Sequence, residues 1–224
     1  MKGKFLIFVI LAPIICFGKE QKKNSPVFTT DWFSNNIEVW DTYKTEFDRK
    51  PNIRCLEIGS WEGRSSLYIA RNYCNGPDSR LYCIDTWEGS KEHSDELRIG
   101  LYERFLGNTK DLRKKKRIVA HRGYSKEVLL ELSAKINKGK GRKFNFIYID
   151  GSHEAKDVLM DAVLAWELLE EGGILIFDDY GWCGDSHHCP KPAIDGFLAC
   201  YKTMYEILLN GYQIHVRKVR STPL

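Results

Sequence analysis

The sequence predicts an α/β protein built on a mostly parallel sheet of seven strands, with helices on both faces and a C-terminal antiparallel hairpin. Three observations predict this class. Short apolar segments alternate with amphipathic segments from residue 53 onward, which is typical of parallel strands joined by crossover helices. Residues 144–149 are apolar on both sides, as expected for a central parallel strand. Asn210-Gly211 separates two strand-like segments and indicates a hairpin.

The strands are expected where short runs of aliphatic, β-branched and aromatic residues end in turn-forming residues. The first run stops before Gly59, and the fourth stops before Asp150-Gly151. In chain order, the strands are predicted at 53–58, 80–84, 117–120, 144–149, 174–177, 205–209 and 212–218.

The helices are expected where apolar residues recur every three to four positions. The aromatic-rich segment 27–50 has this period, with Thr30-Asp31 suited to a helix start and Pro51 closing it. Gly172-Gly173 ends the helical pattern before the fifth strand. The other helices are predicted at 65–72, 92–106, 125–136, 155–169 and 193–204.

The N-terminus differs from the rest of the chain. Lys2 and Lys4 precede an apolar run over residues 5–17, and polar residues return at Lys19. As a helix this run reaches roughly 20 Å, short of the roughly 30 Å hydrocarbon core of a bilayer. We predict a signal peptide over 1–18, with the mature protein secreted or periplasmic. The alternative is a cytoplasmic protein in which the N-terminal segment is not cleaved. This segment would then anchor the protein to a membrane.

The remaining chain is interpreted as an N-terminal helical cap over 19–50 and one α/β domain over 51–224. The composition excludes disordered and collagen-like classes, because 43% of the 224 residues are hydrophobic and the net charge is only +4. Two basic clusters, 110–117 and 135–143, are predicted to be solvated loops. Since no aromatic residues interleave with them for base stacking, no nucleic-acid partner is expected.

The cysteines leave one question open. Of the seven, Cys16 falls within the predicted signal peptide. Cys183 and Cys189 enclose five residues that include His187 and His188. This spacing is wider than that of usual zinc-binding pairs, so a local disulfide and a zinc site both remain possible.

Several candidate binding residues follow the first three strands, at the sheet edge where open parallel sheets bind ligands. Gly59 and Gly63 allow a tight turn and close approach of a ligand, and Glu57 offers an acceptor. Asp85, at the end of the second strand, is suited to the two hydroxyls of a ribose. The remaining candidates, Gly123 and Ser125, follow the third strand and are placed to meet an adenine edge. Each of these residues also has an ordinary role in turns.

Acidic residues follow the fourth and fifth strands. We expect Asp150, Asp178 and Asp179 to share one cleft, where their mutual repulsion favours a hard divalent cation such as Mg²⁺. His153 is the best candidate general base, because imidazole titrates near neutral pH. The alternatives are helix or loop capping for the Asp178-Asp179 pair and a structural role for His153.

Taken together, the chain resembles the class I S-adenosylmethionine-dependent methyltransferases, and more narrowly the bacterial sugar and macrolide O-methyltransferases. The resemblance covers residues 53–218. The segments that carry it are LEIGSWEGRSS at 56–66, IDTWEG at 84–89, FIYIDGSH at 146–153 and GGILIFDDY at 172–180. It implies a Rossmann-like methyltransferase fold.

The resemblance also implies roles for the candidate residues. Glu57, Gly59 and Gly63 would hold the cofactor, Asp85 its ribose, and residues 123–125 would border its adenine. Magnesium would be held by the three aspartates named above, with Asp150 also a catalytic residue. The sugar enzymes usually place a second aspartate two residues after the first, as general base. Here Ser152 occupies that position and His153 follows it.

The expected function is therefore S-adenosylmethionine-dependent O-methylation of a hydroxylated small molecule, with metal assistance. One observation favours an alternative. S-adenosylmethionine is made in the cytosol, whereas the N-terminus resembles an export signal. An exported binding protein that kept the fold and lost catalysis would reconcile the two. A nicotinamide-dependent oxidoreductase is disfavoured, because the first strand is not followed by Gly-x-Gly-x-x-Gly.

Overall fold

The computed structural model describes residues 25–90, 92–184 and 188–220, so the predicted signal peptide over 1–18 lies outside the described residues. The described chain forms a seven-stranded sheet in the order β3-β2-β1-β4-β5-β7-β6. Its strands are β1 (Arg54–Ile58), β2 (Arg80–Asp85), β3 (Ile118–Arg122), β4 (Phe144–Ile149), β5 (Leu169–Phe177), β6 (Tyr205–Asn210) and β7 (Ile214–Lys218). The first five are parallel, and β7 pairs antiparallel with β5 and β6. The predicted fold class is confirmed.

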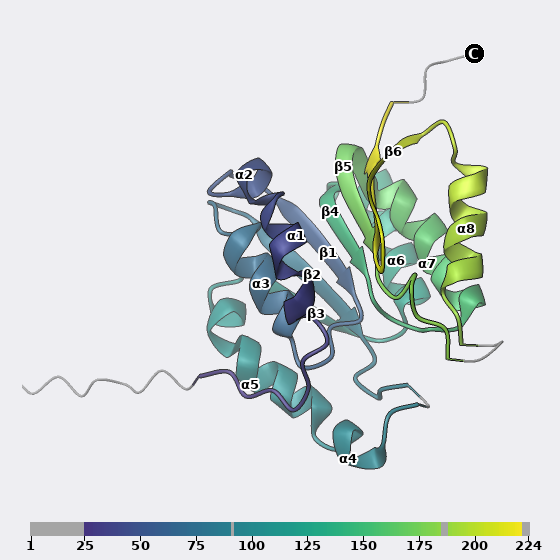
Figure 1. Ribbon diagram of the computed structural model, residues 1–224. Coiled ribbons are helices and arrows are strands. Elements are labelled where there is room, and N and C mark those ends of the chain that lie inside the picture. Colours follow the sequence, from purple (N-terminus) through teal and green to yellow (C-terminus); the bar gives the residue numbers. More distant parts are fainter. Residues whose placement is uncertain (1–24, 91, 185–187, 221–224) are drawn as a thin grey trace, which may run out of the picture.

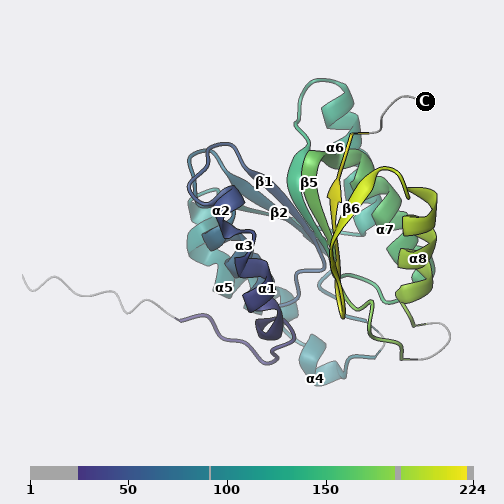
Figure 2. The same ribbon diagram turned by 45° about the horizontal axis from the view of Figure 1, so that its top comes forward.

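Helices cover both faces of the sheet. One side carries α1 (Ile37–Asp41), α3 (Arg64–Asn72) and α5 (Leu101–Lys114), and the other carries α6 (Ser125–Asn137), α7 (Ala155–Leu168) and α8 (Lys191–Cys200) (Figure 1). The short α4 (Asp95–Arg98) lies beyond the end of the strands in both ribbon views (Figures 1 and 2). Among the described residues, no helix combines the length and apolarity needed to cross a membrane.

The two layers of core follow from the alternation of side chains along the strands. On β4, Phe146 and Tyr148 face the α3 and α5 side, where they join a cluster that includes the fully buried Trp40. Ile147 and Ile149 face the other side, with the buried residues of α6, α7 and α8. Because β4 is buried on both faces, it is apolar on both sides in the sequence.

The predicted N-terminal helix over 27–50 is instead three short elements. They are a 3-10 turn at Ser34–Asn36, α1 and α2 (Lys44–Phe47). The interruption follows α1, where the Thr42 hydroxyl donates to the Val39 carbonyl at 2.6 Å and competes with regular helix bonding. The predicted apolar face of this segment is still buried, because Trp40 and Phe47 pack on the sheet.

The predicted helix over 92–106 is divided at Gly100, whose φ of +68° is a left-handed conformation that favours glycine. Beyond it, α5 continues to Lys114, so the basic cluster predicted as a loop over 110–117 is helical in its first half. The helix continues because buried Phe105 and Thr109 keep the apolar period on its inner face.

The fifth strand starts at Leu169 rather than at residue 174, and α7 ends at Leu168. Leu169 pairs with Phe144 and Ile174 pairs with Phe146, so the intervening residues bulge out of the ladder. Gly172, with a φ of +78°, allows this bulge. The glycine pair therefore lies inside a strand instead of ending a helix.

Protonation of His215 on β7 is expected to destabilise the protein. Its ring is fully buried and bonds Tyr43 Oη at 2.8 Å and Gln213 Oε1 at 2.9 Å, a pattern that suits a neutral ring with its hydrogen on Nε2. Burial lowers the pKa of His215 from 6.5 to about 4. The folded state therefore resists protonation, and about 3 kcal/mol of stability, present above pH 6.5, is lost as the pH falls toward 4.

Urea unfolding of the parent and of His215→Gln between pH 4 and 8 tests this expectation. The variant should show a flatter dependence of the free energy of unfolding on pH below 6.5, whatever its stability at neutral pH. Equal slopes for the two proteins would contradict it.

Candidate active site

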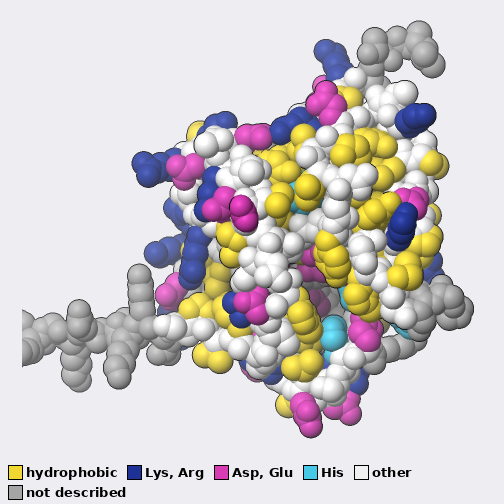
Figure 3. All heavy atoms as spheres, in the orientation of Figure 1, with side chains coloured by type: hydrophobic (Ala, Val, Ile, Leu, Met, Phe, Trp, Pro, Cys, Tyr) yellow, Lys and Arg dark blue, Asp and Glu magenta, His cyan; other side chains and the backbone are white. Residues whose placement is uncertain are grey.

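A cavity of about 1440 Å³ opens at the carboxyl ends of the parallel strands. Each of the five parallel strands contributes a residue at or just after its end. These residues are Gly59, Asp85, Gly123, Asp150 and Asp178. In the space-filling view, acidic and histidine side chains gather in a hollow at the lower centre of the molecule (Figure 3). The cavity lies where an open α/β sheet is expected to bind its ligand.

Gly59 lets the loop after β1 pass against the loop after β4. Its φ is +84°, and a Cβ at this position would lie 1.7 Å from the carbonyl oxygen of Asp150. Since that oxygen belongs to the backbone, no side-chain movement could make room. The two loops therefore meet backbone to backbone, so the close approach that Gly59 allows is that of the loop after β4 and not of a ligand as predicted.

Two of the predicted cofactor-binding residues, Glu57 and Gly63, do not line the cavity. Glu57 is fully buried beneath the loop, where its Oε2 accepts hydrogen bonds from the hydroxyls of Ser60, at 2.7 Å, and Ser66. Burial raises the pKa of Glu57. Gly63, with a φ of +84°, begins α3 and lies against Thr109 and Phe105. Both residues therefore shape the loop after β1 and do not face the cavity.

Asp85 does line the cavity, at the end of β2. Its carboxylate accepts hydrogen bonds from the backbone amides of Ser60, Trp61 and Trp87 at 2.7–2.9 Å. Burial raises the pKa of Asp85 although these amides lower it. The side chain thus locks the β1 loop onto β2 at the wall of the cavity.

The last two of the predicted cofactor-binding residues, Gly123 and Ser125, also line the cavity. Gly123 follows β3, and Ser125 is the first residue of α6. Together with Gly59 and Asp85, they line the cavity.

The acidic residues follow β4 and β5, the two strands beyond β1 in the sheet order. The hydroxyl of the buried Tyr148 lies between two carboxylates: it is 2.9 Å from Asp150 Oδ2 and bonds Asp178 Oδ2. Gln213, from the hairpin, donates to the same Asp178 oxygen at 3.0 Å. Burial and repulsion between the aspartates raise the pKa of Asp150, and raise that of Asp178 to about 6. These buried carboxyls therefore hold their protons more readily than exposed aspartates do.

His153 lies between two further carboxylates. Its Nε2 is 2.9 Å from Asp179 Oδ2, and its Nδ1 is 3.0 Å from Glu92 Oε1 but without hydrogen-bond geometry. Burial by itself lowers the pKa of His153, but the bond to Asp179 and the charge of Glu92 raise it above its ordinary value. Tyr212 donates to the other Asp179 oxygen at 2.9 Å. This network presents the imidazole to the cavity.

The predicted magnesium ligands are close together but do not converge. In the part of the chain that the structure describes, no group of three or more His, Cys, Asp or Glu side chains is arranged to hold a metal ion. Asp150 and Asp178 are directed toward Tyr148, while Asp179 is directed toward His153 and Tyr212. Their oxygens suit Mg²⁺ chemically, but the observed arrangement does not form the predicted three-carboxylate site.

The sequence did not identify an N-terminal strap, residues 27–36, that forms one wall of the cavity. Glu62, almost fully buried, accepts from the backbone and hydroxyl of Thr29 and pairs with Arg104 at 2.5 Å. Trp32 of the strap stacks on His93 at 5.3 Å and packs on Trp61. The many aromatic residues of this segment could have indicated a cavity wall, but they indicate a segment of the core equally well.

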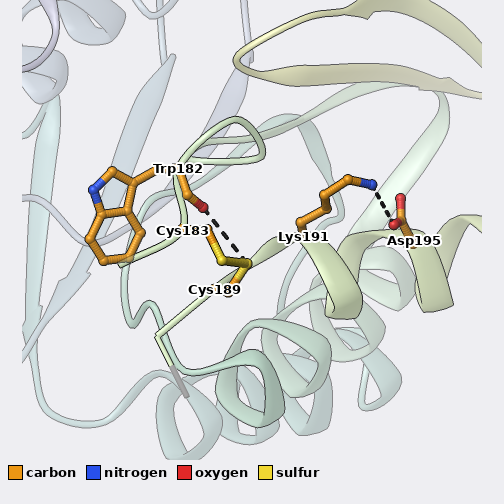
Figure 4. Close-up of a disulfide and its surroundings, with 5 residues drawn as sticks. All are labelled: Trp182, Cys183, Cys189, Lys191 and Asp195. Carbon is orange, nitrogen blue, oxygen red and sulfur yellow. Dashed lines mark hydrogen bonds and ion pairs between the residues drawn. A yellow bond between two sulfur atoms is a disulfide. The ribbon is translucent and has the colours of Figure 1, made fainter. Parts of the chain in front are cut away.

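The second unpredicted wall is the loop that carries Trp182, whose ring lies 4.5 Å from that of His153. The structure joins Cys183 and Cys189 of this loop in a disulfide, which decides between the two predicted alternatives (Figure 4). Cys189 Sγ also lies 4.0 Å from the carbonyl oxygen of Trp182. The disulfide therefore fixes the backbone directly beside a residue of the site.

Comparison with known proteins agrees with this geometry. A family model described as a methyltransferase domain matches residues 56–180, more than half of the chain. The chain belongs to this methyltransferase family, and its assignment to the class I S-adenosylmethionine-dependent methyltransferases is confirmed. No curated protein matches the sequence.

Solved structures share the fold at low sequence identity. The O-methyltransferase TomG from Streptomyces achromogenes, in complex with S-adenosylmethionine, is 16% identical, with a TM-score of 0.61 over 83% of this chain and 80% of TomG. MycE from the mycinamycin biosynthetic pathway, in complex with Mg and S-adenosylhomocysteine, is 19% identical, with a TM-score of 0.54 over 85% of this chain and 51% of MycE. An rRNA methylase from Streptococcus thermophilus is 10% identical, with a TM-score of 0.55 over 87% of this chain and all of that one. These likenesses show the fold and leave the acceptor open.

Proposed function

We propose that this methyltransferase transfers the methyl group of S-adenosylmethionine to a hydroxyl oxygen of a small molecule, with His153 as the base. The observation that carries the proposal is the position of His153. It shares one cavity with Gly59 and Asp85 and lies between the carboxylates of Glu92 and Asp179. The cavity can therefore hold a donor beside an acceptor that must lose a proton.

Bound S-adenosylmethionine supplies an electrophilic methyl group on a positively charged sulfur. Asp179 favours the tautomer of His153 that carries hydrogen on Nε2. Nδ1 is buried 3.0 Å from Glu92 Oε1, so it can take a proton once the acceptor hydroxyl enters between these two atoms. As the acceptor oxygen bonds to the methyl carbon, the carbon–sulfur bond breaks and its electron pair stays on sulfur. The acceptor proton passes to Nδ1, and Asp179 and Glu92 stabilise the resulting imidazolium.

The walls of the cavity help to position the two reactants. Trp32 and Trp61 offer electron-rich faces to a cationic donor, and Trp182 covers His153 on the acceptor side. Most of the acceleration in such a transfer comes from aligning the acceptor oxygen with the methyl group.

Magnesium assistance stays a prediction. The two carboxylates of Asp150 and Asp178 on one tyrosine hydroxyl support it, as does the presence of Mg in the MycE complex. Because the described side chains do not form a three-ligand site, we assign no step to a metal.

Calorimetric titration of the purified chain with S-adenosylmethionine tests the donor. We expect binding at micromolar concentrations, because the cavity presents the glycine loop and Asp85 together. The absence of heat at millimolar concentrations would contradict the proposal and favour a non-catalytic binding protein. Methyl transfer to a panel of phenols, catechols and sugars, with amines and carboxylates as comparison compounds, then tests the acceptor class.

Asp178→Asn separates the metal from the base. If a divalent cation assists, methyl transfer by the parent should depend on Mg²⁺ and that dependence should weaken in the variant, because an amide oxygen carries no charge to hold the ion. Equal rates with Mg²⁺ and with a chelator, in both proteins, would exclude metal assistance and leave the role of His153 intact.

A further inference from the structure

We propose that the Cys183–Cys189 disulfide positions Trp182 over His153, so that the methyl transfer proposed above requires the oxidised loop. The inference rests on the proposed function, in which His153 is the base. The disulfide lies between β5 and α8, and neither cysteine belongs to the sequence segments that carry the family resemblance.

Trp182 lies against the ring of His153 in the cavity. The two ring centroids are 4.5 Å apart at an interplanar angle of 48°, and both residues line the cavity. The ring nitrogens of His153 are directed to Glu92 and Asp179, and its side chain is only 19% exposed. An acceptor hydroxyl that reaches His153 therefore has Trp182 as a neighbour, and the position of the indole affects how the acceptor is aligned.

Contacts with the disulfide loop hold Trp182 in this position. A Cβ built on Gly184 would lie 2.7 Å from Cη2 of Trp182, so the indole packs directly on the backbone of the loop. The Gly184 amide donates to the His188 carbonyl at 2.9 Å, which closes the loop beneath the ring. Figure 4 shows the Trp182 carbonyl directed toward the sulfur of Cys189, 4.0 Å away, with the indole on the other side of the backbone.

The disulfide joins this loop to two ordered parts of the protein. Cys189 is buried and lies two residues before the start of α8, which is anchored in the core. His188 forms a β-bridge with Glu154, the residue that follows His153. Through the sulfur–sulfur bond, the position of Trp182 is therefore set by α8 and by the loop that carries the proposed base.

A thiol reductant can reach the disulfide, because Cys183 is exposed. The two thiols of dithiothreitol would supply two electrons and two protons, so that the disulfide becomes two cysteine thiols and dithiothreitol becomes a cyclic disulfide. Trp182 would then lose its covalent link to α8. Because the cytosol keeps most thiols reduced, the proposal predicts that the enzyme is active in an oxidising compartment, which the predicted signal peptide also indicates.

A purely structural cross-link is the competing explanation, because a disulfide also constrains the unfolded chain. The two explanations differ in what they require. A structural cross-link affects stability whether or not Trp182 is present. A disulfide that acts through Trp182 changes the surroundings of His153 and has no further effect once the indole is removed.

The first test measures how accessible His153 is and needs no acceptor. Diethyl pyrocarbonate acylates accessible imidazoles, and peptide mapping by mass spectrometry gives the rate at each histidine. In the full chain, reduced with dithiothreitol and desalted without air, His153 should react several-fold faster than in the oxidised chain. His121, on β3 and outside the cavity, is the internal reference and should react equally in both. Equal rates at His153 in the two states would overturn the inference.

The second test measures methyl transfer to any acceptor that the parent methylates. Reduction should lower the rate roughly 10- to 100-fold, because the acceptor is no longer aligned. Calorimetric binding of S-adenosylmethionine should stay unchanged, and reoxidation should restore the rate. Trp182→Ala should be slow in both redox states. A reduced parent as fast as the oxidised one, or a Trp182→Ala variant that still responds to reduction, would overturn the inference.

Cys200→Ser is the matched control, because Cys200 is an exposed free cysteine at the end of α8. It should respond to dithiothreitol as the parent does, and loss of the response would overturn the inference by assigning it to that thiol. The double variant Cys183→Ser/Cys189→Ser should be slow without reductant while it still binds the donor, which shows that it is folded. A parent that binds no donor would overturn the proposed function, whereas normal donor binding with no response to reduction would overturn only this inference.

Discussion

Replacement of His153 with asparagine is expected to reduce methyl transfer by roughly 10²- to 10⁴-fold, the range in which general-base catalysis contributes. Asparagine keeps a polar side chain of similar reach but cannot take a proton near neutral pH. Binding of S-adenosylmethionine should stay unchanged, since the ring nitrogens of His153 contact Glu92 and Asp179 and not the residues predicted to hold the donor. Single-turnover rates with any acceptor that the parent methylates measure the loss.

The matched control is His121→Asn. His121 is on β3, stacks on Tyr82 and does not line the cavity. It should keep the parent's rate, so that a loss in His153→Asn cannot be ascribed to removal of any histidine. If His153→Asn transfers methyl groups as fast as the parent, another group is the base.

Substitution of Gly59 by alanine is expected to have the largest effect on stability. The new Cβ would need the position occupied by the Asp150 carbonyl, 1.7 Å away, at a φ of +84°. Either the loop after β1 or the loop after β4 must move. The combination of backbone clash and left-handed strain should cost roughly 3–5 kcal/mol in the free energy of unfolding. It should also abolish binding of S-adenosylmethionine, because the moved loops form the cavity.

Gly139→Ala isolates the strain from the clash. Gly139 has a φ of +67°, and a Cβ there would meet nothing within 4 Å. This variant should lose only about 1–2 kcal/mol, the cost of a left-handed conformation, and should bind the donor normally. Chemical denaturation of both variants checks the difference. Similar losses in the two would show that the contact with Asp150 does not hold the two loops in place.

The fold class and most strand positions could be anticipated from the sequence, because burial of β4 on both faces and alternation elsewhere leave a regular apolar pattern. Element ends were less predictable. Gly100 divides one predicted helix, and Gly172 lies within a bulged strand instead of ending a helix. In both cases a glycine was seen in the sequence, but its backbone conformation depends on what packs around it.

For the site, the sequence by itself determined which residues end the parallel strands, and therefore that Gly59, Asp85, Asp150 and His153 share one cavity. Only the tertiary structure decided where each side chain points. It turned Glu57 beneath the loop, directed the three aspartates to different partners, and brought Trp32, Glu92 and Trp182 to the cavity. The physical reason is that strand ends follow from local periodicity. The direction of a side chain depends on hydrogen bonds and packing between segments far apart in the chain, which leave no local pattern.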